Sequence, residues 1–394
     1  MNDILYLAWR YLTYHRLKTI VLVASIAIIV YLPIGLNIVM SQSAKQLRGR
    51  AEATPLLAGA KGSPLELVLQ SLYFETDVPN SIPYAEVARI KDSELATAIP
   101  LNVKFHSRNG PIVGTTGNYF DFRKLSVIEG RQIAMLGECV IGSDVARTGN
   151  LSIGDHIVSL SEDVFNIAGV YPLKMRIVGV LGPNDSPDDR AVFVDVKTTW
   201  IIEGLGHGHQ ELGRPETSDS GIANEANQVV THTSVLQYNE ITAENVSSFH
   251  FHGDTSTFPI TAIIAVPDDE KANALLQGRY LGDDEEVQIV RPAEVMEKLL
   301  HTIFTVGRYV TFAVTIVGLS TLATMTLVFV LSLQLRRREL ETMMKIGASR
   351  QRVVCMLGAE VFGVLILGAC LAGVLALATS WFAGSALRVL IHLS

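Results

Sequence analysis

The chain has 394 residues, of which 48% are hydrophobic and 18% are charged, and its formal net charge is −7. A soluble globular protein averages about 25% charged residues, so this composition argues against a disordered chain and against an ordinary cytosolic protein. The apolar residues are concentrated in a few stretches instead of being spread along the chain, as they would be for one large core. This concentration indicates a membrane protein.

Three long stretches contain almost no charge. Residues 19–40 and 309–335 have no Asp, Glu, Lys or Arg, and residues 353–387 have only Glu360. Each is long enough for a membrane helix, which needs about 20 apolar residues to cross the hydrocarbon core. The 22 uncharged residues of the first stretch exceed the roughly 7–15 of a signal-peptide core, which favours an uncleaved anchor over a cleaved signal peptide.

The charges that flank these stretches predict the orientation of the chain. Nine of the 32 Lys and Arg residues, but only three of the 39 acids, lie in residues 1–18 and 336–352. The positive-inside rule places both segments in the cytoplasm, so that residues 41–305 lie outside it. Lys45, Arg48 and Arg50 run against the rule, but a large translocated domain largely escapes it. The exported part is acidic, which argues against nucleic acid as a partner.

The sequence of the exported part predicts short strands and a few helices, with a stalk helix at each end. Short runs of β-branched residues between turn residues predict strands at 112–116, 139–142, 156–160, 174–181 and 191–194. A second patch predicts a strand at 260–266, a helix at 268–277 and a strand at 286–290. Pro292 then opens a helix that continues into the second span.

Two features of the exported part exclude particular chemistries. Residues 58–64 are rich in glycine and predict a loop, but the Walker A spacing is absent and no predicted strand precedes it, so nucleotide binding is not expected. Cys139 is the only cysteine of the exported part, so no internal disulfide is expected.

The predicted fold class is therefore a membrane protein with an α-helical transmembrane part of three spans and a large α+β extracytoplasmic domain between spans 1 and 2. The predicted segments are a cytoplasmic amphipathic lead at 1–18, spans at 19–40, 306–335 and 353–379, the exported domain at 41–305, a cytoplasmic loop at 336–352 and a short extracytoplasmic or interfacial tail at 380–394.

The exported part contains six short motifs: Gly117-Asn-Tyr-Phe120, Glu129-Gly-Arg131, Glu138-Cys-Val-Ile-Gly-Ser-Asp-Val-Ala146, Leu151-Ser-Ile-Gly-Asp155, Ile177-Val-Gly-Val-Leu181 and Ala191-Val-Phe-Val194. Together they resemble the core domain of MacB-type ABC transporter permeases. The segment Arg337-Arg-Glu-Leu-Glu-Thr-Met-Met-Lys-Ile-Gly-Ala-Ser-Arg350 resembles the cytoplasmic loop of the FtsX-like permease domain. That domain ordinarily has a further membrane helix, so a three-span variant, a fragment and a tail that folds back all stay open.

The resemblance implies a multi-pass protein of the bacterial cytoplasmic (inner) membrane, with its N-terminus in the cytoplasm, that works as a dimer with itself or a related permease. A separate cytoplasmic ABC ATPase would bind ATP and Mg²⁺, since this chain has no ATPase motif. A periplasmic or outer-envelope partner is a further expectation. The chain itself is expected to be non-catalytic, with no cofactor of its own apart from a candidate zinc site.

The cytoplasmic loop predicts a short helix that contacts the ATPase. Residues 336–345 combine mixed charge with an apolar face, and Gly347 and Ser349 suit a helix C-cap and the N-cap of the third span. An interfacial anchor is the alternative, and the resemblance favours a coupling helix. The candidate coupling residues are Arg337, Arg338, Glu339, Leu340, Met343, Met344, Lys345, Gly347 and Ser349.

Glu360 is the one charged residue inside the three apolar stretches 19–40, 309–335 and 353–387. It could be a functional carboxylate, could be paired across a dimer, or could be partly exposed near the lipid headgroups. The uncharged stretches 19–40 and 309–335 contain no charged residue that could line a pathway, which argues against a small-solute pore.

A histidine-rich insert at 203–253 is a departure from the family pattern. It holds five of the ten histidines, and imidazoles suit Zn²⁺ or another divalent metal. A solvated polar insertion is the alternative. The candidate metal ligands are His207, His209, His232, His250 and His252.

The resemblance implies mechanotransmission: ATP-driven motion passes through the membrane helices to the exported domain, which exports or extracts a lipid-linked or peptide substrate. One alternative is an FtsX-like transducer that regulates an extracytoplasmic hydrolase. The other is a metal-handling membrane sensor that uses the histidine-rich insert.

Overall fold

The computed structural model describes residues 2–75, 80–160, 172–208, 222–225, 228–231, 239–282, 284–346 and 349–391. The chain divides into two compact units. Unit 1 comprises residues Met1–Leu47 and Lys298–Ser394, and unit 2 comprises residues Arg48–Glu297.

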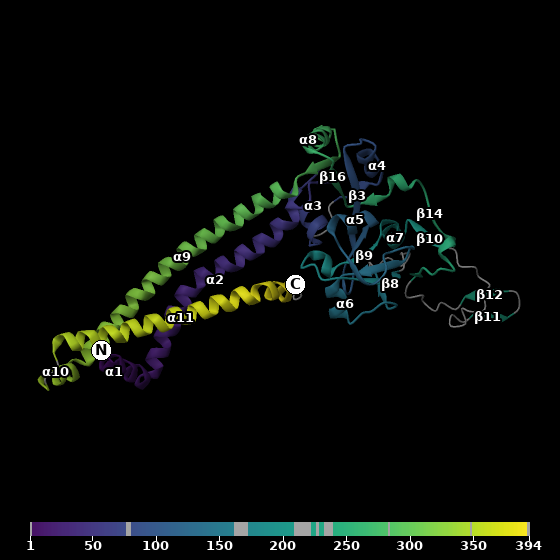
Figure 1. The fold of residues 1–394 in the computed structure, drawn as a ribbon. Helices are drawn as coiled ribbons and strands as arrows, with labels where there is room; N and C mark the ends of the chain where they lie inside the picture. Colours follow the sequence, from purple (N-terminus) through teal and green to yellow (C-terminus); the bar gives the residue numbers. More distant parts are fainter. Residues whose placement is uncertain are drawn as a thin grey trace. The chain divides into compact units, whose positions relative to one another are not determined.

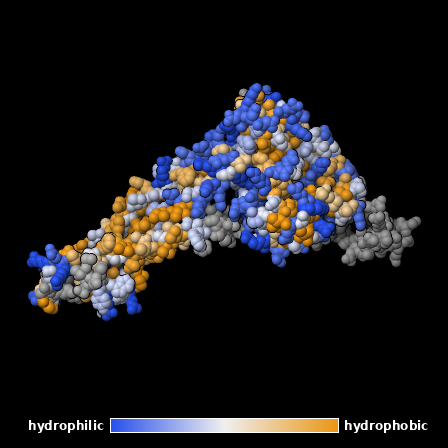
Figure 2. All heavy atoms as spheres, viewed as in Figure 1, coloured by the Kyte–Doolittle hydropathy of each residue, from blue (hydrophilic) through white to orange (hydrophobic). Residues whose placement is uncertain are grey.

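Unit 1 is built from helices. They are α1 (Asn2–Tyr14), α2 (Arg16–Glu52), α9 (Pro292–Leu335), α10 (Arg337–Lys345) and α11 (Arg350–Ile391), of which α2 and α9 extend into unit 2. Figure 1 shows the long α2, α9 and α11, and Figure 2 shows hydrophobic residues gathered along them.

Three of these helices are long and apolar enough to cross a membrane. Among the described residues they are Arg16–Glu52, Pro292–Leu335 and Arg350–Trp381. Many of their large apolar side chains are exposed, as lipid-facing residues must be, including Phe312, Val317 and Leu377. The prediction of three apolar helices is confirmed. The last helix continues without a break to Ile391, so residues 382–391 extend α11 where the sequence predicts a separate tail.

Unit 2 contains an eleven-stranded mixed sheet in the order β13-β8-β6-β9-β4-β3-β16-β1-β17, with β5 and β7 paired to β8. Its strands are β1 (Leu56–Ala60), β3 (Ala96–Ser107), β4 (Gly110–Thr115), β5 (Val127–Gly130), β6 (Glu138–Ile141), β7 (His156–Val158), β8 (Leu173–Leu181), β9 (Val192–Asp195), β13 (Asn239–Glu240), β16 (Ala262–Pro267) and β17 (Val287–Val290).

Short helices and two-stranded pairs complete unit 2. The α-helices are α3 (Pro64–Val68), α4 (Ala85–Lys91), α5 (Gly117–Arg123), α6 (Ser143–Gly149), α7 (Val196–Ile202) and α8 (Glu270–Arg279). The shorter helices are η1 (Leu69–Tyr73), η2 (Pro187–Arg190), η3 (Val246–Ser248) and η4 (Thr255–Thr257). The paired strands are β2 (Ile82–Pro83) with β15 (Pro259–Ile260), β10 (Gly206–Gly208) with β14 (Phe249–Phe251), and β11 (Ile222–Glu225) with β12 (Gln228–Thr231).

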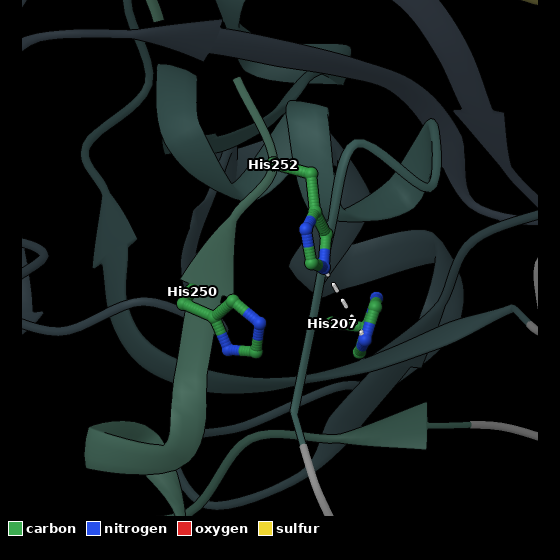
Figure 3. Close-up of side chains that lie close together, drawn as sticks. All are labelled: His207, His250 and His252. Atoms are coloured by element: carbon green, nitrogen blue, oxygen red, sulfur yellow. Dashed lines mark hydrogen bonds between the residues drawn. The ribbon is translucent and has the colours of Figure 1, made fainter. Parts of the chain in front are cut away.

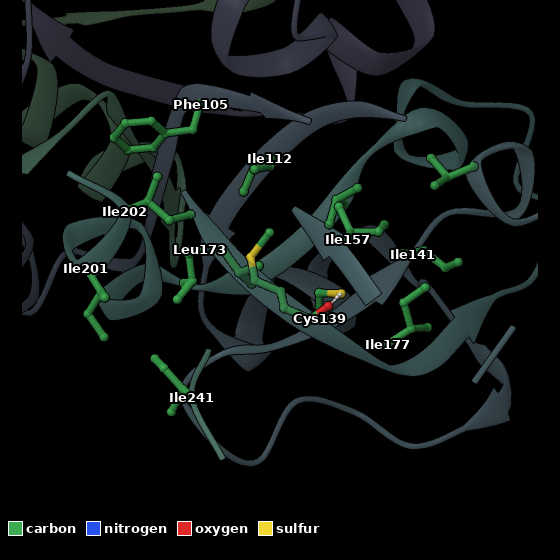
Figure 4. Close-up of a cluster of buried hydrophobic side chains, with 14 of the residues drawn as sticks. Phe105, Ile112, Cys139, Ile141, Ile157, Leu173, Ile177, Ile201, Ile202 and Ile241 are labelled. Atoms are coloured by element: carbon green, nitrogen blue, oxygen red, sulfur yellow. Dashed lines mark hydrogen bonds between the residues drawn. The ribbon is translucent and has the colours of Figure 1, made fainter. Parts of the chain in front are cut away.

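Two clusters of buried apolar side chains stand out in the core of the described part of unit 2. One contains Phe105, Cys139 and Ile177 among its members, and Figure 4 shows how these side chains lie between the strands. The other surrounds Trp200. Helix α7 belongs to both, because Ile201 and Ile202 enter the first cluster and Trp200 enters the second. Burial raises the pKa of the Cys139 thiol, so this thiol stays protonated and packs as a small apolar group.

The strands and the helix predicted from the two patches of unit 2 are present, with boundaries that differ by a residue or two. The prediction that residues 58–64 form a loop with no strand before it is wrong, since Leu56–Ala60 form β1 between β16 and β17. This strand consists of leucine, alanine and glycine and lacks the β-branched residues that mark a strand. Gly59 is needed there, because an added Cβ would lie 2.3 Å from Cδ1 of Leu67.

Candidate functional site

The cytoplasmic loop forms the helix α10, as the sequence predicts. An ion pair of 3.2 Å joins Arg337 Nε and Glu341 Oε1 one turn apart. Met344, near the end of this helix, and Ile346, which follows it, are exposed apolar residues, and Ile346 is 82% exposed. An exposed isoleucine next to a charged helix suits contact with an apolar partner surface or with lipid.

The remaining coupling residues are described only in part. Arg338 and Lys345 are exposed, and Ser349 Oγ accepts a hydrogen bond of 3.4 Å from the N–H of Arg352, consistent with an N-cap of α11. The side chains of Glu339, Leu340 and Met343, and the whole of Gly347, lie outside the described residues. The apolar face of α10 is therefore defined in the structure only by Met344.

Glu360 lies on α11 and is buried, with only 3% of its surface exposed. An ion pair of 3.3 Å joins its Oε2 to Nη1 of Arg336, at the start of the loop, while Oε1 has no hydrogen-bond partner among the described residues. The Arg336 guanidinium also lies over the ring of Tyr11 on α1, 3.8 Å from its centroid. Glu360 is thus paired within its own chain rather than exposed, and it links α11, α1 and the loop.

A second buried charge network lies where α2 ends inside unit 2. Arg50 and Asp188 form a bidentate ion pair with N–O distances of 2.6 and 2.9 Å, and their side chains are 7% and 1% exposed. Tyr119 accepts a hydrogen bond of 2.9 Å from Arg50 and donates one of 2.7 Å to Asp188. Arg50 Nε donates to the carbonyl oxygen of Leu72. The last turn of α2 is therefore tied to three separate segments of unit 2.

The electrostatics of this network follow from burial and from the arginine charge. Burial alone would raise the pKa of Asp188, but Arg50 and the hydrogen bonds of Arg50 and Tyr119 outweigh it, so the pKa lies below the ordinary aspartate value. Burial, together with the charge of Asp188, raises the pKa of Tyr119 to about 12. At neutral pH the network therefore consists of a guanidinium, a carboxylate and a neutral phenol.

Sequence reasoning missed this network. Arg50 was visible only as a cation that runs against the positive-inside rule, and Tyr119 only as part of a motif. The partners of Arg50 lie 138 and 69 residues away in the sequence, at Asp188 and Tyr119, so no local pattern pairs them.

The motif residues Arg131 and Glu138 form another ion pair of unit 2. Arg131 donates two hydrogen bonds to the Glu138 carboxylate, one of them 2.7 Å long. Glu138 also accepts from the backbone N–H groups of Ala134 and Met135. Burial would raise the pKa of Glu138, and these hydrogen bonds reverse the effect, so the pKa is lowered. This pair holds the turn between β5 and β6.

Three of the five predicted metal ligands lie together. Figure 3 shows His207, from β10, beside His250 and His252, from β14 and the residue after it. One ligand nitrogen from each lies within 4.8 Å of the others. His209 and His232 lie outside the described residues.

The sequence profile of the MacB-like periplasmic core domain matches residues 20–212. The periplasmic region of MacB from Actinobacillus actinomycetemcomitans is 11% identical, with a TM-score of 0.34, and the alignment covers 63% of this chain and 94% of that chain. The extracellular domain of the noncanonic ABC-type transporter YknZ from Gram-positive bacteria is 13% identical, with a TM-score of 0.33, 60% of this chain and 99% of that chain being covered. TM-scores this low do not establish a shared fold. No curated protein matches the chain.

The profile match and the three apolar helices define the class: this is a permease subunit of an ABC transporter, located in the inner membrane. Over residues 20–212, just under half of its length, the chain is similar to the MacB-like family of these permeases. Permease components of ABC transporters are generally non-catalytic and work with an ABC ATPase.

Proposed function

We propose that this permease transmits ATP-driven motion from a cytoplasmic ATPase to its extracytoplasmic domain. The observation that carries the proposal is α2, a single unbroken helix of 37 residues from Arg16 to Glu52. Its apolar part is long enough to cross a membrane, and its last turn ends in the buried Arg50 network. Pro33 lies inside this helix, but the helix continues through it. A continuous helix that ends in a buried ion pair can pass rotation or displacement to the domain that holds its end, which a flexible linker cannot do.

At the other end of the path, α10 is the segment that would contact the ATPase. The ion pair of Arg336 with Glu360 ties the start of this loop to α11, and Tyr11 ties it to α1. Motion of α10 would therefore move the membrane helices together instead of being lost in the loop. In this proposal the N-terminus and α10 lie in the cytoplasm, and unit 2 lies outside.

The proposed assembly is a dimer, either of this chain or with a related permease, bound to two ATPase subunits. The expected substrate class is a lipid-linked molecule or a peptide that unit 2 exports or extracts. The expected ligands of the ATPase, ATP and Mg²⁺, would bind to that partner alone.

The ATPase contact can be tested by substitution on α10. Met344→Asp and Met343→Asp place a charge at apolar positions of the helix, and we expect each to lower co-purification of the ATPase while membrane insertion is unchanged. Leu281→Asp is the matched control, because Leu281 is an exposed apolar residue of unit 2 with 81% of its surface exposed. Equal recovery of ATPase with the α10 variants and with the control would show that α10 is only an interfacial anchor.

Transmission itself needs a readout in unit 2. We expect trapping of the nucleotide-bound ATPase to change hydrogen exchange in residues 48–297 of the wild-type protein. The same trapping should give a much smaller change in Arg50→Met/Asp188→Leu, which retains the ATPase. If that double variant responds like the wild type, the end of α2 is not the transmitting element.

A further inference from the structure

We propose that His207, His250 and His252 form a binding site for Zn²⁺ or a closely similar divalent transition metal. The proposal stands on its own geometry and does not depend on how the permease is driven. It concerns a site in unit 2, on the face of the β10–β14 pair that points away from the core.

The strand register brings the three imidazoles to one face. His207 and His250 are direct partners across the antiparallel pair. His250 and His252 are two residues apart, so their side chains point to the same side of an extended chain. The N–H of His252 bonds to the carbonyl oxygen of Leu205 at 3.2 Å, which continues the pairing one step past the end of β14. The two paired strands thus place all three imidazole rings on one face.

The opposite face of the same strand holds the pair against the core. Phe249 and Phe251 alternate with the two histidines, and Phe251 lies edge-on to Trp200, with ring centroids 5.9 Å apart. The glycines on either side of His207 make this packing possible. An added Cβ on Gly206 would lie 2.7 Å from the ring of Phe251, and one on Gly208 would lie 2.6 Å from that of Phe249. The histidine side chains are therefore exposed, while the backbone that holds them is fixed by the packing of the phenylalanines on the opposite face.

The ring positions are close to those that one metal ion requires. Nε2 of His207 and Nε2 of His252 are 3.5 Å apart. Two nitrogens on a tetrahedral Zn²⁺ with Zn–N bonds of roughly 2.0–2.1 Å are about 3.3 Å apart. All three ligand atoms lie within 4.8 Å of one another. The remaining difference is small enough for side-chain rotation of exposed rings to close, without movement of the strands.

One hydrogen bond also sets the tautomer of a ligand. Nδ1 of His250 lies 3.2 Å from the carbonyl oxygen of Ser248. A carbonyl oxygen can only accept, so Nδ1 is the protonated nitrogen, and in the neutral ring Nε2 has the lone pair that a metal needs. A backbone carbonyl behind a ligating histidine is the arrangement that usually orients such a ligand and raises its basicity.

The donor set determines the kind of ion. Among the described residues the donor set is three imidazoles and no carboxylate. Such a set favours Zn²⁺, Cu²⁺ or Ni²⁺ over Mg²⁺ and Ca²⁺, which prefer oxygen ligands. The three ligands that the described part of the chain supplies are one fewer than the four of a closed structural site, and they leave a position for a further ligand. All three histidines are exposed, which suits reversible binding more than a structural metal.

The experiment uses the full chain in detergent, purified with an affinity tag that contains no histidine. Zn²⁺ is titrated in competition with a chromophoric chelator, and Co²⁺ is added separately to record its visible absorption. We expect one ion per chain, no competition from Mg²⁺, and Co²⁺ bands typical of low coordination number. His207→Ala, His250→Ala and His252→Ala should each weaken Zn²⁺ binding at least tenfold, since even loss of an outer-shell partner costs about 10–100-fold.

His106→Ala is the matched control, because His106 is an exposed histidine of β3 in the same unit and is not one of the three clustered residues. It should leave the affinity unchanged, and Trp200 fluorescence should show that every variant is folded. The proposal is overturned if the chain binds no Zn²⁺ at micromolar concentration. It is also overturned if the three variants bind as tightly as the wild type, which would place the ion elsewhere on the chain.

Discussion

Removal of Arg50 should destabilise unit 2 far more than removal of a neighbouring arginine on the same helix. In Arg50→Ala the carboxylate of Asp188, whose side chain is 1% exposed, would keep its hydrogen bonds from Tyr119 and Ser186 but lose both bonds from the guanidinium. Removal of one partner of a buried ion pair costs about 3–5 kcal/mol, because the other charge remains buried without compensation. For a unit that comprises residues 48–297, each kcal/mol lowers the midpoint of thermal unfolding by roughly 2–4 °C, so the expected decrease is about 6–20 °C.

The assay is thermal unfolding followed by tryptophan fluorescence. Trp200 is fully buried in unit 2, whereas Trp9 and Trp381 are 58% and 86% exposed. A background with Phe at these two positions makes Trp200 the sole reporter of unit 2. The matched control is Arg48→Ala, since Arg48 forms only an exposed pair of 3.9 Å with Glu52; loss of such a pair costs about 0.5 kcal/mol or less.

A double variant separates lost charge pairing from lost packing. Arg50→Met/Asp188→Leu removes both charges, and replacement of a buried pair by apolar residues is often close to neutral. We therefore expect its unfolding midpoint to lie above that of Arg50→Ala. If Arg50→Ala unfolds at the same temperature as Arg48→Ala, the buried network does not anchor the end of α2, and the reasoning behind the proposed transmission fails.

Three further predictions concern charge and backbone. The folded-state pKa of Asp188 is lowered, so its contribution to stability is present above the unfolded pKa of about 3.9 and is lost as the pH falls through the lower folded pKa. The difference in unfolding free energy between wild type and Asp188→Asn should therefore stay constant from about pH 8 to 5 and shrink only below about pH 4. A decline at higher pH would contradict this prediction. Arg336→Ala should shorten the half-life of the detergent-solubilised protein at elevated temperature, because Glu360 stays buried and loses its ion pair with Arg336. Arg337→Ala removes only an exposed ion pair and should have little effect. Equal half-lives of the two variants would refute this prediction. Gly130→Ala should lower the unfolding midpoint more than Gly154→Ala. Both glycines have a positive φ, but only at Gly130 would the added Cβ meet a backbone oxygen, that of Val178 at 2.2 Å. Similar chemical-denaturation curves for the two variants would argue against that contact.

The sequence predicts well those elements whose residues have a regular pattern of their own. The three apolar helices follow from the absence of charge over lengths that match a bilayer, and β8 and β9 follow from runs of β-branched residues. The strand β1 does not, because its leucine, alanine and glycine are acceptable in a strand only through the neighbours on either side, β16 and β17. The strand conformation of β1 therefore depends on its neighbours in the sheet and not on its own residue types.

The candidate sites divide in the same way. His250 and His252 could be assigned to one face from their spacing alone, and the Ser349 cap from its position before an apolar run. That His207 lies opposite His250 depends on pairing between strands more than forty residues apart in the sequence, which only the structure supplies. The buried Arg50 network was not predicted at all, since Arg50, Asp188 and Tyr119 each look like ordinary surface-compatible residues until the sheet brings them together.

Because α2 is one continuous helix, residues inserted between the membrane and the exported domain both lengthen the helix and turn it. Each residue added to an α-helix advances it by about 1.5 Å and turns it by about 100°. One residue inserted between positions 41 and 47 would thus carry Arg50 about 100° around the helix axis relative to the apolar residues that precede it. Seven added residues make nearly two full turns and return Arg50 to within about 20° of its original direction, about 10 Å further out. Along α2 itself, a change of seven or eleven residues therefore nearly preserves the direction of Arg50 around the helix axis, whereas a change of one residue does not.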